Sequence, residues 1–126
     1  MEPTRTPEDC HRCFTAAFAA KDLEALLALY EAEPTIVTEP GQPPATGRAA
    51  LHALLSELLA SDCRLRQETT SVLRAGDLAL LRATWRLTGT SPEGEALDIK
   101  HNSIEVVRRQ ADGTWLFVID DPFGGD

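Results

Sequence analysis

Residues 78–89 read LALLRATWRLTG, and their alternation of apolar and polar side chains decides the fold. Arginine and threonine fill the even positions from 82 to 88, whereas the odd positions are apolar: Ala79, Leu81, Ala83, Trp85 and Leu87. Successive side chains of a strand point to opposite faces of a sheet. The stretch therefore predicts an antiparallel strand with one buried face.

Similar strand signals lie on either side of this stretch, and the second half of the chain is expected to form a sheet. Turns that contain glycine separate the four predicted strands, which cover residues 63–74, 78–89, 96–109 and 115–121. In the third strand, apolar residues move from odd positions (Leu97, Ile99) to even ones (Ile104, Val106). This switch predicts either a β-bulge near residues 101–103 or a strand whose two halves bury opposite faces.

The first half of the chain reads mainly as helices. The predicted elements are a helix over about 7–20 that starts at Thr6-Pro7, a short helix capped by Asp22 that ends before Pro34, a strand over 35–38, a loop over 39–47 and a helix over about 48–60. Helices followed by strands indicate an α+β fold, with helices packed on one face of a curved sheet. The open end of such a cone is a natural pocket for a small molecule.

The composition excludes several classes of function. The chain has 126 residues, with 12 Lys and Arg against 20 Asp and Glu, and a formal net charge of −8 at pH 7. This length fits one domain, and the acidic balance argues against nucleic-acid and anionic-membrane partners, because affinity for phosphate grows with clustered Lys and Arg. No apolar run approaches the roughly 18 residues of a membrane span. The first residues include no apolar signal-peptide segment, so a cytoplasmic location is expected.

Cys10 and Cys13 form a CxxC motif around His11, and Cys63 makes the number of cysteines odd. A redox CxxC follows a strand at a helix N-terminus, and no strand can precede Cys10. A zinc site needs two more ligands, but there is no second CxxC or HxxxH motif. The spacing instead matches the apolar face of a helix formed by Cys10, Cys13, Phe14, Ala17 and Phe18. We therefore expect reduced structural cysteines, no metal and no cofactor.

Several short stretches, in this order of elements, resemble the NTF2-like superfamily and, within it, the SnoaL-like and ketosteroid-isomerase-like group. They are AAKDLEALLALY over Ala19–Tyr30, the strand and proline turn Thr35–Pro40, Thr46-Gly-Arg48, Arg109–Trp115, and the ending Ile119–Gly124, which looks like small bacterial members. The resemblance implies one domain over residues 1–126, shaped as a cone with helices in the concave face of a curved sheet. It also implies a homodimer that forms through the sheet.

The resemblance further implies where catalytic residues lie. The general base of the isomerases falls on Glu39, where it could take a proton from a carbon next to a carbonyl; an exposed loop carboxylate is the alternative. One oxyanion donor falls on Phe14, which cannot donate a hydrogen bond. The other falls close to Asn102, with His101 beside it, and either could instead be a polar residue of a bulge or a dimer face. Loss of one donor typically lowers the rate by roughly 100- to 1,000-fold, so steroid isomerisation is disfavoured.

The expected ligand-binding residues are mostly aromatic or apolar: Phe14, Phe18, Tyr30, Trp85, Ile119 and Asp121. Trp85 and Tyr30 also fit the core, because the core and the pocket lining of a cone are continuous. Asp120 and Asp121 point to opposite faces of the last strand, so they cannot act together. We expect one of them to face the pocket, assigned to Asp121, and the other to cap the turn at Pro122.

Two classes of function follow. The first is a domain that binds a small, mostly apolar, ring-containing carbonyl compound and acts as a cofactor-free acid–base enzyme of the isomerase, cyclase or hydratase type. The second is a non-catalytic dimeric module that binds a ligand or a partner. If Glu39 pointed to solvent and Phe14 and Trp85 filled the cone, catalysis would be excluded.

Overall fold

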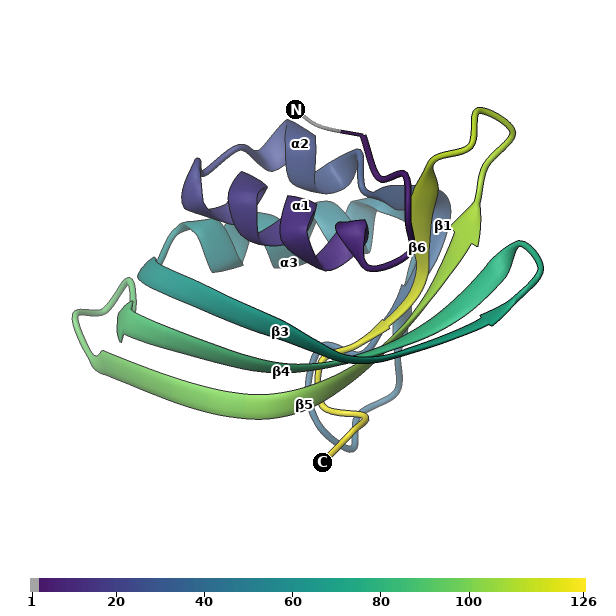
Figure 1. The fold of residues 1–126 in the computed structure, drawn as a ribbon. Helices are drawn as coiled ribbons and strands as arrows, with labels where there is room; N and C mark the ends of the chain where they lie inside the picture. The colour runs from purple at the N-terminus through teal and green to yellow at the C-terminus, as the bar shows by residue number, and fades with distance from the viewer. Residues whose placement is uncertain (1–2) are drawn as a thin grey trace.

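The computed structural model describes residues 3–126, and Figure 1 shows their three helices above one curved sheet. The element order is α1 (Asp9–Ala19), α2 (Leu23–Leu27), β1 (Tyr30–Ile36), β2 (Ala45–Thr46), α3 (Arg48–Leu59), β3 (Asp62–Ala75), β4 (Leu78–Thr90), β5 (Ala96–Arg109) and β6 (Trp115–Asp121). The strands pair in the order β2-β1-β6-β5-β4-β3, with β1 and β6 parallel and all other neighbours antiparallel. This confirms the predicted α+β class with a curved, mostly antiparallel sheet.

The helices cover the concave face of the sheet, so the core lies between the two layers (Figure 1). Helix α1 buries the apolar face that its spacing predicts, including Cys10, Cys13 and Phe18. The three cysteines are present as thiols, and burial raises the pKa of the Cys10 thiol, as expected for a structural cysteine. Trp115 and Phe117 of β6 are among the largest buried side chains and stabilise the fold by removing apolar surface from water. No described helix is long and apolar enough to cross a membrane.

The helix termini differ from the prediction in two places. Helix α1 begins at Asp9, and no side chain caps its N-terminus. The Asp9 carboxylate instead accepts hydrogen bonds from the backbone N–H groups of Arg5 and Thr6, which precede the helix. Asp22 caps α2 as predicted, through the backbone N–H of Ala25. The prediction that Tyr30 belongs to this second helix is wrong: α2 ends at Leu27, and Tyr30 begins β1, because it pairs with Phe117 of β6.

The register of β5 determines which residues face the helices. The predicted bulge near residues 101–103 is absent, since β4 and β5 pair without interruption from Ala96 to Arg108. Alternate residues from Leu97 to Val107 therefore face the concave side, and Ile104 and Val106 lie on the outer face of the sheet. The register shifts lie elsewhere: in β1 between Tyr30 and Thr35, in β3 between Thr69 and Ser71, and in β6 opposite Val106 and Val107.

Candidate functional site

A cavity of about 260 Å³ lies between the helices and the concave face of the sheet. Most of its lining is apolar: Phe14, Val37, Leu54, Leu55, Leu58, Leu65, Trp85, Leu87, Ile99, Phe117, Pro122 and Phe123. The polar lining residues are His11, Tyr30, Thr38, Gln67, Ser103, Glu105 and Asp120. Concave, mostly apolar sites with a few convergent polar groups are typical of small-molecule binding.

Two acidic side chains lie next to each other on neighbouring strands in this cavity. Glu105 of β5 pairs across the sheet with Asp120 of β6, and the cross-strand register places both on the concave face. Glu105 is 3% exposed, as is His11 of α1, whose Nε2 lies 2.5 Å from Glu105 Oε1. The other ring nitrogen of His11 lies 2.8 Å from the Thr69 hydroxyl. Both nitrogens of this buried imidazole are therefore satisfied by the protein.

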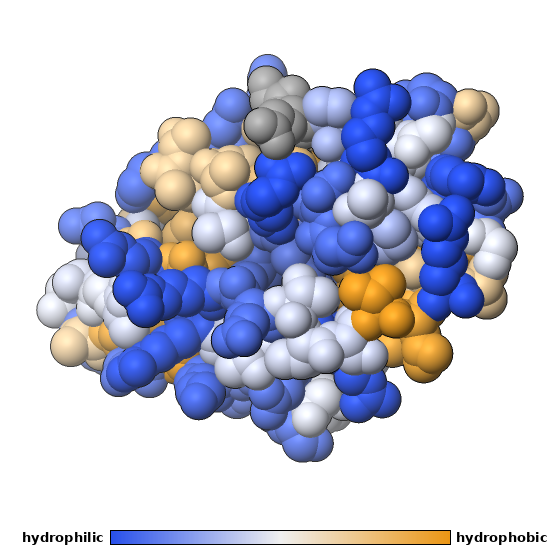
Figure 2. All heavy atoms as spheres, in the orientation of Figure 1, coloured by the Kyte–Doolittle hydropathy of each residue, from blue (hydrophilic) through white to orange (hydrophobic). Residues whose placement is uncertain are grey.

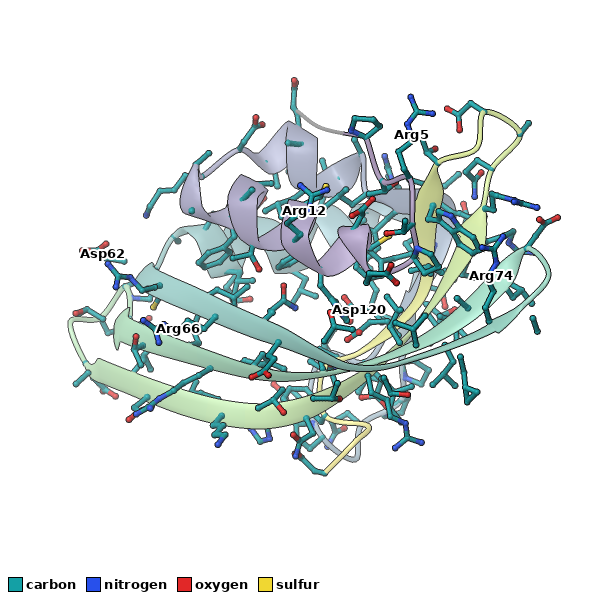
Figure 3. All side chains as sticks on the ribbon, viewed as in Figure 1. Arg5, Arg12, Asp62, Arg66, Arg74 and Asp120 are labelled. Atoms are coloured by element: carbon teal, nitrogen blue, oxygen red, sulfur yellow. The ribbon has the colours of Figure 1, made fainter. Side chains whose placement is uncertain are left out.

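Asp120 is the cavity group best suited to proton transfer. Its carboxylate accepts a 2.6 Å hydrogen bond from the Tyr30 hydroxyl, and Figure 3 shows its side chain between the sheet and the helices. Burial, with the negative charge of Glu105, raises the pKa of Asp120 to about 7, although the Tyr30 hydrogen bond and His11 act in the opposite direction. Burial and Asp120 also hold the pKa of Tyr30 well above its ordinary value. Near neutral pH, Asp120 can thus take or give a proton.

The predicted base is not at this site. Glu39 lies in the exposed segment between β1 and β2 and is not among the residues that line the cavity. Phe14 and Trp85 contribute to the walls but do not fill the cone, because the cavity remains between them. Glu39 is exposed, but the cone is not filled, so only one of the two conditions for excluding catalysis is met. The acidic residues that line the cavity are Glu105 and Asp120.

His101 and Asn102, the predicted donors, do not line the cavity and instead hold segment 122–126. His101 Nδ1 lies 2.5 Å from Asp126 Oδ2, and the backbone N–H of Asn102 donates to the same carboxylate at 2.7 Å. These contacts lower the pKa of Asp126, and the hydrogen bond from the Asn102 backbone has the largest effect. The Asn102 carbonyl accepts a 2.9 Å hydrogen bond from the N–H of Gly125.

Segment 122–126 covers one side of the cavity. Pro122 and Phe123 belong to its lining, and the Pro122 carbonyl accepts a 2.7 Å hydrogen bond from Trp85 Nε1. The Phe123 ring packs edge-on against His101 at 4.9 Å between ring centroids. His101 is therefore a residue that holds the cavity wall in place.

Removing the His101 side chain should loosen this wall. In His101→Ala, the backbone N–H groups of segment 122–126 should exchange with deuterated water roughly two- to fivefold faster, because a hydrogen bond and a ring contact are lost. Hydrogen–deuterium exchange followed by mass spectrometry measures this. His52→Ala, which removes an exposed histidine of α3, is the matched control. Equal exchange in both variants would contradict the role of His101.

The predicted ligand-binding residues divide into two groups. Phe14, Tyr30 and Trp85 line the cavity. Phe18 lies in the core at 4% exposure, and Ile119 is 41% exposed, because the register shift in β6 turns it to the outer face. The assignment of the last acidic pair is reversed: Asp120 faces the cavity, and Asp121 caps the following turn through the N–H of Phe123.

Sequence reasoning missed His11 and Glu105, and each lies three residues from a predicted position. His11 precedes Phe14 by one helical turn, whereas Glu105 follows Asn102 along β5. An uninterrupted alternation from Ile99 would have placed Glu105 on the buried face. Among the described residues, no group of three or more His, Cys, Asp or Glu side chains is arranged to hold a metal ion.

Comparisons with known proteins agree with this geometry. A family model described as a SnoaL-like domain matches residues 11–118. No curated protein sequence matches the chain. A ketosteroid isomerase-like protein from Erwinia carotovora atroseptica is similar in structure, with a TM-score of 0.77 and 21% identity over 90% of this chain and 89% of that one.

Two further solved structures share the fold. A protein from Thiobacillus denitrificans, described as a candidate association domain of calcium/calmodulin-dependent protein kinase type II, has a TM-score of 0.75 and 25% identity over 98% of this chain and 99% of that one. A candidate dehydratase of the NTF2-like family from Streptomyces avermitilis has a TM-score of 0.73 and 20% identity over 90% of each chain. These likenesses confirm the predicted NTF2-like cone.

Proposed function

The chain belongs to the SnoaL-like domain family, and on that basis we propose that its cavity binds a small, mostly apolar molecule and transfers a proton to or from it. Asp120 carries this proposal, because a carboxyl group with a pKa of about 7 in a mainly apolar cavity can act as base or acid near neutral pH. The class of reaction is that of a cofactor-free isomerase, cyclase or hydratase on a ring-containing carbonyl compound.

The surrounding groups support this role for Asp120. The Tyr30 hydroxyl fixes one carboxylate oxygen, and the buried charge of Glu105 makes Asp120 a stronger base than an exposed aspartate. His11 holds Glu105 and limits the repulsion between the two acidic groups. The volume of about 260 Å³ is close to the lower end of small-molecule sites, roughly 300 Å³, which suits a ligand of one or two rings.

Deuterium exchange tests the proposal with 1-tetralone, a neutral bicyclic ketone, as the probe. In deuterated water near neutral pH, the protein should speed deuterium incorporation at the carbon next to the carbonyl by at least about tenfold over buffer. Proton NMR follows the loss of the signal from that carbon. A rate equal to that of buffer would contradict acid–base catalysis by this cavity.

A second proposal concerns the outer face of the sheet, through which we propose that two copies of the chain associate. On this face, four apolar residues lie side by side on β3, β4, β5 and β6 and form one cross-strand row: Leu73, Leu80, Val106 and Ile119. Leu73 is 63% exposed, and Figure 2 shows hydrophobic spheres over the hairpin end of β3 and β4. An exposed apolar row is typical of an interface, and two copies related by a twofold axis would bury it.

A charge placed in this row should separate the copies. The native chain should have twice the 13.7 kDa mass of one chain at low micromolar concentration, whereas Leu80→Glu should have the mass of a monomer, because the carboxylate would be buried against apolar residues. Size-exclusion chromatography with light scattering measures both masses. Thr88→Glu, on the same strand and the same face but outside the row, is the matched control and should remain dimeric. A monomeric native chain would contradict the proposed interface.

A further inference from the structure

Ser103 has a buried hydroxyl that the protein does not satisfy. It lies on β5 between His101 and Glu105, faces the cavity and is 2% exposed. Among residues 3–126, its Oγ is the one buried side-chain polar atom without a hydrogen-bond partner. Buried polar groups are nearly always paired, so an unpaired group in a cavity wall points to a ligand atom as its partner.

The neighbours of Ser103 in the sheet cannot supply that partner. Ala83 lies directly beside it on β4 and has no polar side chain, and Thr69, the next residue in the same row, hydrogen-bonds His11. Two other polar groups of the wall are also engaged, since Gln67 Oε1 accepts from Thr15 and Trp85 Nε1 donates to Pro122. The Ser103 hydroxyl is thus a hydrogen-bond donor that the fold leaves available to the cavity.

The charges of the cavity determine which kind of ligand oxygen can accept a hydrogen bond from the Ser103 hydroxyl. Glu105 and Asp120 are both acidic, and none of the described residues that line the cavity is Arg or Lys. A carboxylate or phosphate of a ligand would meet repulsion from these groups with no Arg or Lys to offset it, because His11 is already paired with Glu105. A neutral acceptor, such as a ketone oxygen, meets no such repulsion.

We infer that Ser103 donates a hydrogen bond to the carbonyl oxygen of a neutral ligand and thereby selects uncharged ketones over hydrocarbons and carboxylates. The inference rests on the proposed function for its ligand class. When Asp120 takes a proton from the carbon next to the carbonyl, the electron pair of the broken C–H bond moves onto the carbonyl oxygen as an enolate. The Ser103 hydroxyl stabilises this oxygen, and Asp120 returns a proton to carbon.

Binding of three matched probes tests the role of Ser103: 1-tetralone, the hydrocarbon tetralin, and the carboxylate 1,2,3,4-tetrahydro-1-naphthoate. Titration followed by the fluorescence of Trp85 in the cavity wall gives each dissociation constant. The native chain should bind the ketone about tenfold more tightly than tetralin, and the carboxylate more weakly than the ketone. Ser103→Ala should reduce the ketone preference to about twofold and leave tetralin binding unchanged.

One control variant and one independent measurement keep this test decisive. Ser56→Ala makes the same substitution outside the cavity lining and should keep the ketone preference. The inference is overturned if the native chain binds ketone and tetralin equally, or if Ser103→Ala keeps the preference. Failure of the proposed function gives a different result: deuterium exchange would not depend on Asp120, although the ketone preference would still depend on Ser103.

Discussion

The Asp120→Asn variant should lose nearly all of the native acceleration and exchange deuterium into 1-tetralone at least about tenfold more slowly than the native chain, close to the rate in buffer. The asparagine side chain keeps the size of the carboxyl group and can still accept a hydrogen bond from Tyr30, but it cannot take a proton from carbon. Because burial and Glu105 disfavour the charged form of Asp120, the neutral variant should be at least as stable as the native chain above pH 7. A lower rate without lower stability distinguishes an acid–base role from a structural one.

The same group sets the expected pH dependence. The exchange rate of the native chain should rise through about pH 7 and level off above it, because the base form of Asp120 is the ionised one. The stability should change in the opposite direction. Since folding raises the pKa of Asp120, its contribution is fully present below the ordinary value of 3.8 and is lost as the pH rises through about 7. Exchange rates and urea unfolding measured across this range give both curves.

Asp98→Asn is the matched control for Asp120→Asn. Asp98 lies on the outer face of β5 and pairs with Arg86, away from the cavity. This variant should keep the native rate and its pH profile. A similar loss of rate in both variants, or a native rate that does not vary between pH 5 and about pH 9, would contradict the assignment of Asp120.

The second large effect is expected on stability. His11→Ala should lower the free energy of unfolding by about 3–5 kcal/mol near neutral pH, because it leaves the Glu105 carboxylate buried without its partner. Both side chains of this pair are only 4% exposed, so water cannot readily replace the imidazole. This is a large share of the roughly 5–15 kcal/mol that stabilises a typical domain. Urea unfolding followed by tryptophan fluorescence measures the difference.

Replacing both members of the pair should lower the free energy of unfolding less than replacing His11 alone. The double variant His11→Leu with Glu105→Met places apolar side chains where the pair was, and should regain most of the stability lost in His11→Ala. Arg86→Ala, which breaks an exposed pair, should leave the free energy of unfolding nearly unchanged. A loss below about 1 kcal/mol in His11→Ala would show that Glu105 is hydrated or uncharged in the native chain.

The fold follows from local patterns that the sequence displays directly. The alternation from Ala79 to Leu87 and the helical spacing from Cys10 to Phe18 depend only on neighbours in the chain, and both predictions are confirmed. Tyr30 was misplaced because its strand conformation depends on parallel pairing with β6, which lies far away in the sequence. Helix periodicity within one short segment cannot detect such a partner.

The site was harder to predict because it depends on register. The apolar residues Ile104 and Val106 led to the prediction of a bulge or of two halves of β5 that bury opposite faces, although both residues belong to the outer face of the sheet. Glu105 was therefore overlooked, and the order of Asp120 and Asp121 was reversed by a register shift in β6. A shift of one residue moves every following side chain to the opposite face. Local patterns do not reveal where such a shift occurs.

The uninterrupted pairing of β5 with β4 has a consequence for how the chain can change during evolution. Ser103 and Glu105 face the cavity, whereas Ile104 and Val106 face outward on the same strand. Point substitutions at alternate codons can thus alter the interior and the exterior independently, so relatives could diversify in the molecules they accept without altering their surface. Loss or gain of one codon within this strand would exchange the two faces together. Homologous genes should therefore tolerate substitutions here far more often than single-codon insertions or deletions.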